Sequence, residues 1–123
     1  MPDVRFPVEV VRGIPVVATP EEVDITNATE LRTALLEASA GGPGTLVVDM
    51  TRTLFCDSAG LHALVGAHRR AVTEGGEVVL AVTGEAVLRI LALTGLGAVI
   101  PNFTSLEQAL AQTAGAQRPS GAA

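Results

Sequence analysis

A hydroxyl lies directly beside a carboxylate in the stretch CDSAGL, residues 56–61. Three kinds of chemistry use such a pair. Asp57 or Ser58 could cap a helix, because a side-chain oxygen accepts a hydrogen bond from a free N–H group of the first turn. Ser58 could act as a nucleophile if a base lay close to it. Ser58 could also be a group that another enzyme modifies.

The residues around Ser58 do not favour catalysis. His62 follows four residues later, but the G-x-S-x-G turn that exposes a hydrolase nucleophile is absent. Six residues after Cys56 the chain has His62, where phosphatase and rhodanese-like loops often have Arg, so Cys56 is interpreted as a small, partly buried hydrophobic residue. One Cys with His62 and His68 makes a poor metal ligand set. We therefore expect no enzyme, no cofactor and no metal.

Asp49 raises another alternative, a receiver domain that accepts a phosphoryl group. It ends an apolar run, as a receiver's acceptor Asp does. A receiver also needs a Lys late in the chain, and this sequence has no Lys at all. Asp49 is therefore interpreted as a strand-end residue that bonds backbone N–H groups of the following loop.

The composition limits the kind of protein. The chain has 123 residues, 48% hydrophobic residues, a net charge of -5 and one Cys. This size fits one domain. The charges are dispersed, so no basic patch for nucleic acid is present. A single Cys fits a reducing compartment, and neither a signal peptide nor an apolar run of membrane-spanning length is evident. The sequence therefore predicts a soluble cytoplasmic protein.

The secondary structure that positions Ser58 begins with two short runs of β-branched residues. The runs at 8–11 and 15–19 predict a hairpin, joined at residues 12–14. The stretch PEEVD, residues 20–24, predicts a turn or a short extended piece.

Helix-start signals follow the hairpin and return near the end of the chain. Asn27 with Glu30, and Thr104 with Glu107, have the spacing of a capping box. The Gly pair at 41–42 predicts the end of the first of these helices. The other predicted elements are strands at 45–50, 78–82 and 97–101, and helices at about 58–73 and 84–95.

This order predicts an α/β fold. We expect a mixed, mostly parallel sheet of about five strands, with an N-terminal β-hairpin and four helices. Residues 1–113 form a single predicted domain, and residues 114–123 form a predicted disordered tail that lacks apolar residues for a core. Functional groups of such sheets gather beyond the carboxyl ends of strands. The loop from Asp49 to Asp57 therefore places Ser58 at an edge that a partner can reach.

The whole pattern resembles the STAS family and, more narrowly, the bacterial anti-sigma-factor antagonists. The resemblance covers about residues 5–113. The segments that carry it are EEVD (21–24), LFCDSAGL (54–61), GGEVVLA (75–81) and LALTGLG (91–97).

The resemblance implies a partner switch. The unphosphorylated antagonist binds an anti-sigma factor, usually a Ser/Thr kinase of the histidine-kinase-like ATPase type, and so frees a sigma factor. The kinase phosphorylates the Ser that follows the motif Asp, which is Ser58 here, and a Ser/Thr phosphatase reverses the reaction. Asp57 is the adjacent acid, and Asp24 matches an acidic position near the partner surface. The family often has a second Ser where this chain has Ala59, so Ser58 is the only hydroxyl of the motif.

Physical chemistry agrees with such a switch. A helix start tolerates a phosphate because its free N–H groups and partial positive charge favour anions. We expect Ala59 and Gly60 to keep the helix start slim for a partner backbone, and His62 to lie at the rim. Two other roles for a STAS module stay open, namely a docking subunit of a lipid-transport ABC complex and a part of a stress-signalling assembly. Weak homodimerisation also stays open.

Overall fold

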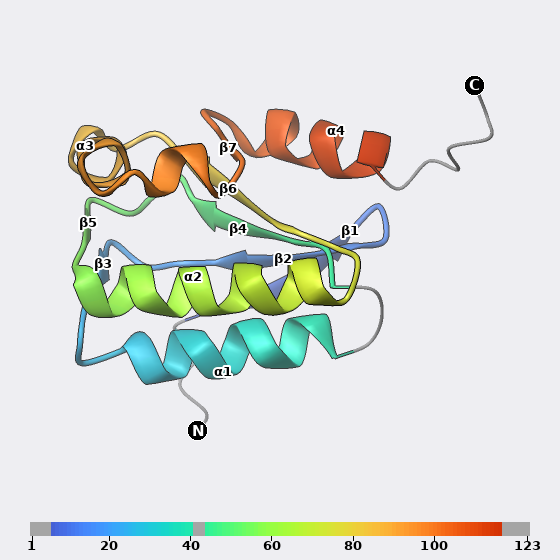
Figure 1. Ribbon diagram of the computed structural model, residues 1–123, viewed down its shortest axis with the longest axis horizontal. Coiled ribbons are helices and arrows are strands. Elements are labelled where there is room, and N and C mark those ends of the chain that lie inside the picture. Colours follow the sequence, from blue (N-terminus) through green and yellow to red (C-terminus); the bar gives the residue numbers. More distant parts are fainter. Residues whose placement is uncertain (1–5, 41–43, 117–123) are drawn as a thin grey trace.

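A five-stranded mixed sheet forms the centre of the molecule (Figure 1). The computed structural model describes residues 6–40 and 44–116. The spatial order of the strands is β1-β2-β4-β6-β7, in which only β1 runs antiparallel to its neighbour. The strands are β1 (Val8–Val11), β2 (Ile14–Ala18), β4 (Leu46–Met50), β6 (Val78–Val82) and β7 (Asn102–Phe103).

The predicted hairpin is confirmed, with a two-residue turn. Val11 pairs with Ile14, so only Arg12 and Gly13 lie between the strands. Their φ values are 54° and 81°. Positive φ at both central residues is typical of the type I′ turn, whose twist matches that of the strands it joins. Arg12 also forms an ion pair with Glu107, with 2.8 Å between Nη2 and Oε2.

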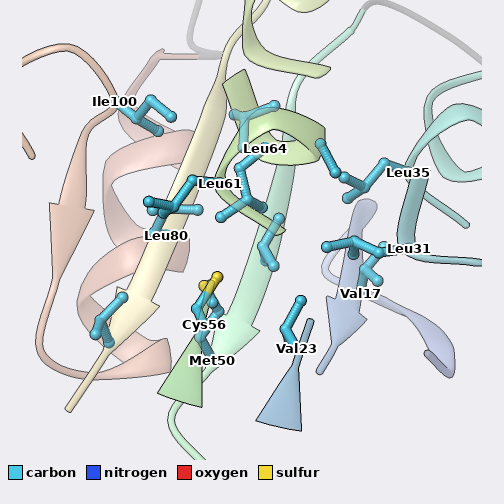
Figure 2. Packing of buried hydrophobic residues seen from close by; sticks show 14 of the residues in the cluster. Val17, Val23, Leu31, Leu35, Met50, Cys56, Leu61, Leu64, Leu80 and Ile100 are labelled. Atoms are coloured by element: carbon cyan, nitrogen blue, oxygen red, sulfur yellow. The ribbon is translucent and has the colours of Figure 1, made fainter. Parts of the chain in front are cut away.

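Helices cover both faces of the sheet. One face packs against α1 (Ala28–Ser39) and α2 (Ser58–Thr73), and the other packs against α4 (Leu106–Ala116). This two-sided cover explains why all five residues of β6 are buried. Figure 2 shows the larger core, where Leu31 and Leu35 of α1 meet Leu61 and Leu64 of α2 over the sheet.

A second, two-stranded parallel sheet joins the stretch predicted as a turn or short extended piece (20–24) to the segment predicted as a loop before α2. It joins β3 (Glu22–Val23) to β5 (Phe55–Cys56), with Val23 opposite Cys56. Both inward residues are buried. The sequence pattern could not predict these strands because each has only two residues. This small sheet leads directly into α2.

The last strand differs from its prediction. The sequence indicated a strand over 97–101, but the 3₁₀ helix η1 (Leu96–Ala98) occupies its beginning, and β7 starts at Asn102. The cause lies at Gly95, which ends α3 (Glu85–Thr94) with a left-handed φ of 79° and turns the chain straight into η1. Ile100 then enters the core as the end of a turn.

Two capping predictions are also wrong in detail. Asn27 precedes α1 but makes no side-chain cap bond. At α4 the capping residue is Ser105, not Thr104, since Ser105 Oγ accepts a hydrogen bond from the Gln108 N–H at 3.1 Å. Ser105 and Gln108 therefore have the capping-box spacing, one residue later than predicted. Glu107 instead accepts a hydrogen bond from Arg12.

Two other predictions concern the ends of helices. The Gly pair predicted to end α1 lies outside the described residues. Helix α4 continues to Ala116, past the predicted start of the tail. Residues 117–123 lie outside the described part, so the predicted domain boundary stays a prediction.

Candidate functional site

Asp57 caps α2, and Ser58 is the first residue of the helix. Asp57 has an extended backbone, with φ −91° and ψ −175°, and its Oδ1 accepts a hydrogen bond from the Gly60 N–H at 3.1 Å. This leaves Ser58 free of the capping role. Ser58 is exposed, and its hydroxyl has no hydrogen-bond partner among the described residues. Of the two capping alternatives, the structure therefore selects Asp57.

The second oxygen of Asp57 holds a distant segment. Oδ2 accepts a hydrogen bond from the Ile25 N–H at 3.1 Å, and the Asp57 N–H donates to the Val23 carbonyl at 3.0 Å. One residue thus joins the start of α2 to the chain between β3 and α1. Figure 1 shows these segments together at one end of α2.

The segment from Asp24 to Asn27 is fixed by its own polar side chains. Asp24 Oδ1 accepts hydrogen bonds from the N–H and the hydroxyl of Thr26, at 2.9 and 2.5 Å. Asn27 Oδ1 accepts from the Asp24 N–H, and its Nδ2 donates to the Glu22 carbonyl, both at 2.9 Å. Asn27 therefore shapes this turn, which explains why its side chain does not cap α1. The structure does bring Asp24 close to Asp57, through Ile25.

Two buried Thr hydroxyls hold the loop that leads to the site, and sequence analysis did not predict this role. Thr19 and Thr53 are almost fully buried and share a hydrogen bond of 2.5 Å between their Oγ1 atoms. Thr53 also bonds the Pro20 carbonyl at 2.8 Å. These contacts hold the loop after β4 against the end of β2. Thr19 follows β2 directly and Thr53 is the third residue after β4, so a Thr after each of two buried strands was the available sequence signal.

The interpretation of Asp49 is confirmed. Its Oδ1 accepts hydrogen bonds from the N–H and the hydroxyl of Thr51, at 3.0 and 2.7 Å. Asp49 therefore fixes the start of the loop after β4, which is a structural role.

Cys56 is part of the core. Its side chain is 1% exposed and lies in the hydrophobic cluster (Figure 2). Burial, with a smaller contribution from the carboxylate of Asp57, raises the pKa of the Cys56 thiol to about 12. The thiolate that a nucleophile requires is thus strongly disfavoured. The interpretation of Cys56 as a small hydrophobic residue is confirmed.

Gly60 faces the interior, which corrects its expected role. A Cβ at this position would lie 2.7 Å from Cys56 Sγ and 2.7 Å from Val23 Cγ1. Gly60 is therefore needed so that α2 can approach the small sheet, and it does not serve to slim the outer surface. Ala59, by contrast, is partly exposed beside Ser58.

The two His residues have separate positions. His62 is exposed on the first turns of α2, and Arg69 is exposed further along; a contact of His62 with a partner stays a prediction. His68 is buried, and its Nδ1 accepts a hydrogen bond from the Val78 N–H at 3.2 Å. His68 thus fastens α2 to the start of β6. Among the described residues, no three His, Cys, Asp or Glu side chains gather as a metal would require.

Comparison with known proteins agrees with this fold and motif. The model of the STAS domain matches residues 5–109. This chain belongs to the STAS family. An anti-sigma factor antagonist from Mycobacterium paratuberculosis is 30% identical, with a TM-score of 0.80 over 88% of this chain and 92% of that one.

Two further solved structures share the fold at lower identity. One is an anti-sigma-factor antagonist (STAS) domain protein from Planctomyces limnophilus, 19% identical, with a TM-score of 0.81 over 89% of this chain and 97% of that one. The other is the phosphorylated form of the Bacillus cell fate determinant SpoIIAA. It is 23% identical, with a TM-score of 0.67 over 87% of this chain and 97% of that one. None of the helices in the described STAS domain is long and apolar enough to span a membrane.

Proposed function

We propose that this STAS protein is an anti-sigma-factor antagonist, and that phosphorylation of Ser58 switches off its binding to an anti-sigma factor. The observation that carries the proposal is the state of Ser58, an exposed hydroxyl without a hydrogen-bond partner in the described chain, at the first position of α2. A kinase can reach this hydroxyl without disturbing a bond of the fold. The similarity to an antagonist at 30% identity supports the class of partner.

The start of α2 can accept a phosphate. Within the described chain, the backbone N–H groups of Ser58 and Ala59 have no acceptor, because Asp57 occupies only that of Gly60. A phosphate on Ser58 can accept hydrogen bonds from these groups and gains from the positive end of the helix dipole. Phosphorylation therefore leaves the fold intact.

The same phosphate opposes partner binding. It adds about -1.5 to -2 charges to a surface that otherwise presents a small neutral hydroxyl. A contact formed over Ser58 would have to desolvate these charges beside the carboxylate of Asp57. A hundredfold loss of affinity corresponds to about 2.7 kcal/mol, which is within the effect of one misplaced charge. The affinity for the partner falls while the domain stays folded.

The partners of the proposal are an ATPase-type anti-sigma factor with Ser kinase activity and a phosphatase that restores Ser58. The chain itself acts as a binding protein and needs no catalytic residue. Its other candidate contacts are Asp24 and Ala59, which are partly exposed, and His62, which is exposed.

Phosphorylation in vitro tests the proposal. An ATPase-type anti-sigma kinase encoded beside this chain, given ATP, should add one phosphate to the wild type and none to Ser58→Ala, as measured by intact mass. Thr73→Ala, at the other end of α2, is the matched control and should be modified normally. Ser58→Asp should bind the kinase about a hundredfold more weakly than the wild type. Equal labelling of wild type and Ser58→Ala would contradict the proposal.

A further inference from the structure

Three exposed apolar side chains belong to the segments that meet at Asp57, directly before Ser58, although exposure of apolar groups to water is unfavourable. Ile25 is 77% exposed, Leu54 is 61% exposed and Phe55 is 48% exposed. We call these three residues the apolar trio. Core packing does not explain their presence, since the core residue of β5 is Cys56 and that of β3 is Val23.

Backbone hydrogen bonds hold the apolar trio around Asp57 and Ser58. The N–H groups of Leu54 and Phe55 both donate to the Glu21 carbonyl, at 2.8 and 3.2 Å. The Ile25 N–H donates to Asp57, as described above. The apolar side chains are therefore presented by fixed backbone on both sides of Asp57, and a partner need not order this backbone on binding.

Strand alternation defines what surrounds Phe55. Side chains alternate between the two faces of a strand, and Cys56 and Val23 point into the core. Phe55 therefore shares the outer face of the small sheet with Asp57, and Glu22 lies opposite Phe55 in the register. The outer face thus combines an aromatic ring with carboxylates.

The charges at this face have one dominant sign. Glu21 and Glu22 are exposed, and Asp24 and Asp57 are partly exposed. Residues 20–27 and 51–62 together contain these four acids, one Arg (Arg52) and one His (His62). An apolar centre with an acidic rim fits a partner surface with an apolar socket and basic side chains around it.

We propose that the apolar trio is the anchor for the anti-sigma factor, and that Phe55 and Ile25 enter an apolar socket ringed by Arg or Lys side chains of that partner. The inference rests on the proposed function and deepens it. Exposed aromatic side chains at the centre of a contact supply much of its binding energy. The chain has only three Phe residues, and Phe55 is the exposed one among them.

This anchor also explains why one phosphate is an effective switch. Ser58 follows Asp57 directly, between Phe55 and the segment held at Ile25. When the apolar trio is covered, a phosphate at Ser58 must lose its water beside an apolar contact.

Affinity measurements with exposed-residue variants test the inference. Isothermal titration of the anti-sigma kinase that the wild type binds should show about tenfold or greater loss for Ile25→Ser and for Phe55→Ser. Phe55→Leu keeps part of the apolar area and should lose less. Val72→Ser is the matched control, because Val72 is 54% exposed at the far end of α2, about 20 Å from Ser58, and should bind normally. Urea unfolding of each variant excludes a loss caused by the fold.

The outcomes separate the inference from the function on which it rests. If Ser58→Asp abolishes binding while Ile25→Ser and Phe55→Ser bind like the wild type, the anchor is wrong and the switch stands. If the wild type binds no anti-sigma factor, both are wrong. If the apolar variants change only self-association, measured by sedimentation, the trio serves a second copy of this chain and the inference is overturned.

Discussion

Asp57 accepts a hydrogen bond from the Ile25 N–H at 3.1 Å, which joins two segments that are 32 residues apart in the chain. Its other oxygen caps α2 through the Gly60 N–H. Asp57 therefore uses both carboxylate oxygens within the fold. Asp57 thus ties the exposed residue Ile25 to the helix start at which Ser58 is exposed, and a role as a general base for Ser58 does not fit this bonding.

Replacing Asp57 should reveal its two bonds separately. Asp57→Ala loses both and should lower the free energy of unfolding by about 1–3 kcal/mol, the sum of a helix cap and one further hydrogen bond. Asp57→Ser retains a good cap but is too short to reach Ile25, so it should lose about half as much. Urea unfolding at neutral pH measures both. Equal losses in the two variants would show that the cap contributes nothing.

Much of this site was predictable from the sequence. The apolar run that ends near Asp49 predicted strand β4, and the capping residues predicted the start of α2 at about Ser58. Both elements are confirmed. Ser58 stood out because its hydroxyl lies beside a carboxylate at a helix start, beyond the carboxyl end of a predicted strand, in a segment that resembles the STAS motif. The phosphorylation itself stays a prediction.

The rest depended on contacts between segments far apart in the chain. The pairing of β3 with β5 involves two residues a strand, too few for a sequence period to appear. The exposure of Ile25 and Phe55 follows from that pairing, because apolar residues next to a motif otherwise look like core. The capping-box spacing also assigned the wrong partner to Asn27. Its side-chain amide forms hydrogen bonds with the backbone of Glu22 and Asp24 and not with the first turn of α1.

Gly60 and Gly66 lie on the same helix and should respond oppositely to Ala. At Gly60 the new Cβ would meet Cys56 and Val23, so Gly60→Ala should lower the free energy of unfolding by about 1–3 kcal/mol through overpacking. At Gly66 a Cβ has nothing within 4 Å, so Gly66→Ala should raise it by about 0.5–1 kcal/mol through helix propensity.

Chemical unfolding of both Gly variants measures this difference under identical conditions. The pair controls for helix propensity, which favours Ala at both positions, and leaves the close approach to the small sheet as the only opposing factor. Stabilisation by Gly60→Ala would show that α2 can move away from Val23 without cost.

Cys56 should control the response of the fold to alkaline pH. The chain has no Lys and no Tyr, so Cys56 is its only side chain expected to titrate between about pH 9 and 12. Burial raises the pKa of the folded thiol from 9.0 to about 12, whereas the unfolded thiol keeps its ordinary value. The unfolded state therefore releases its proton first, and the free energy of unfolding should fall as the pH rises from about 9 to 12.

Urea unfolding across this pH range tests the role of Cys56, with Cys56→Ala as the control. The variant starts from a lower stability because it loses a buried sulfur, but its stability should change less between about pH 9 and 11. Alkylation gives a second readout. At pH 9 about 0.1% of a thiol with a pKa of 12 is ionised, against about half of an ordinary Cys thiol. The folded protein should thus react with iodoacetamide far more slowly than the urea-unfolded chain, and equal rates would place Cys56 at the surface.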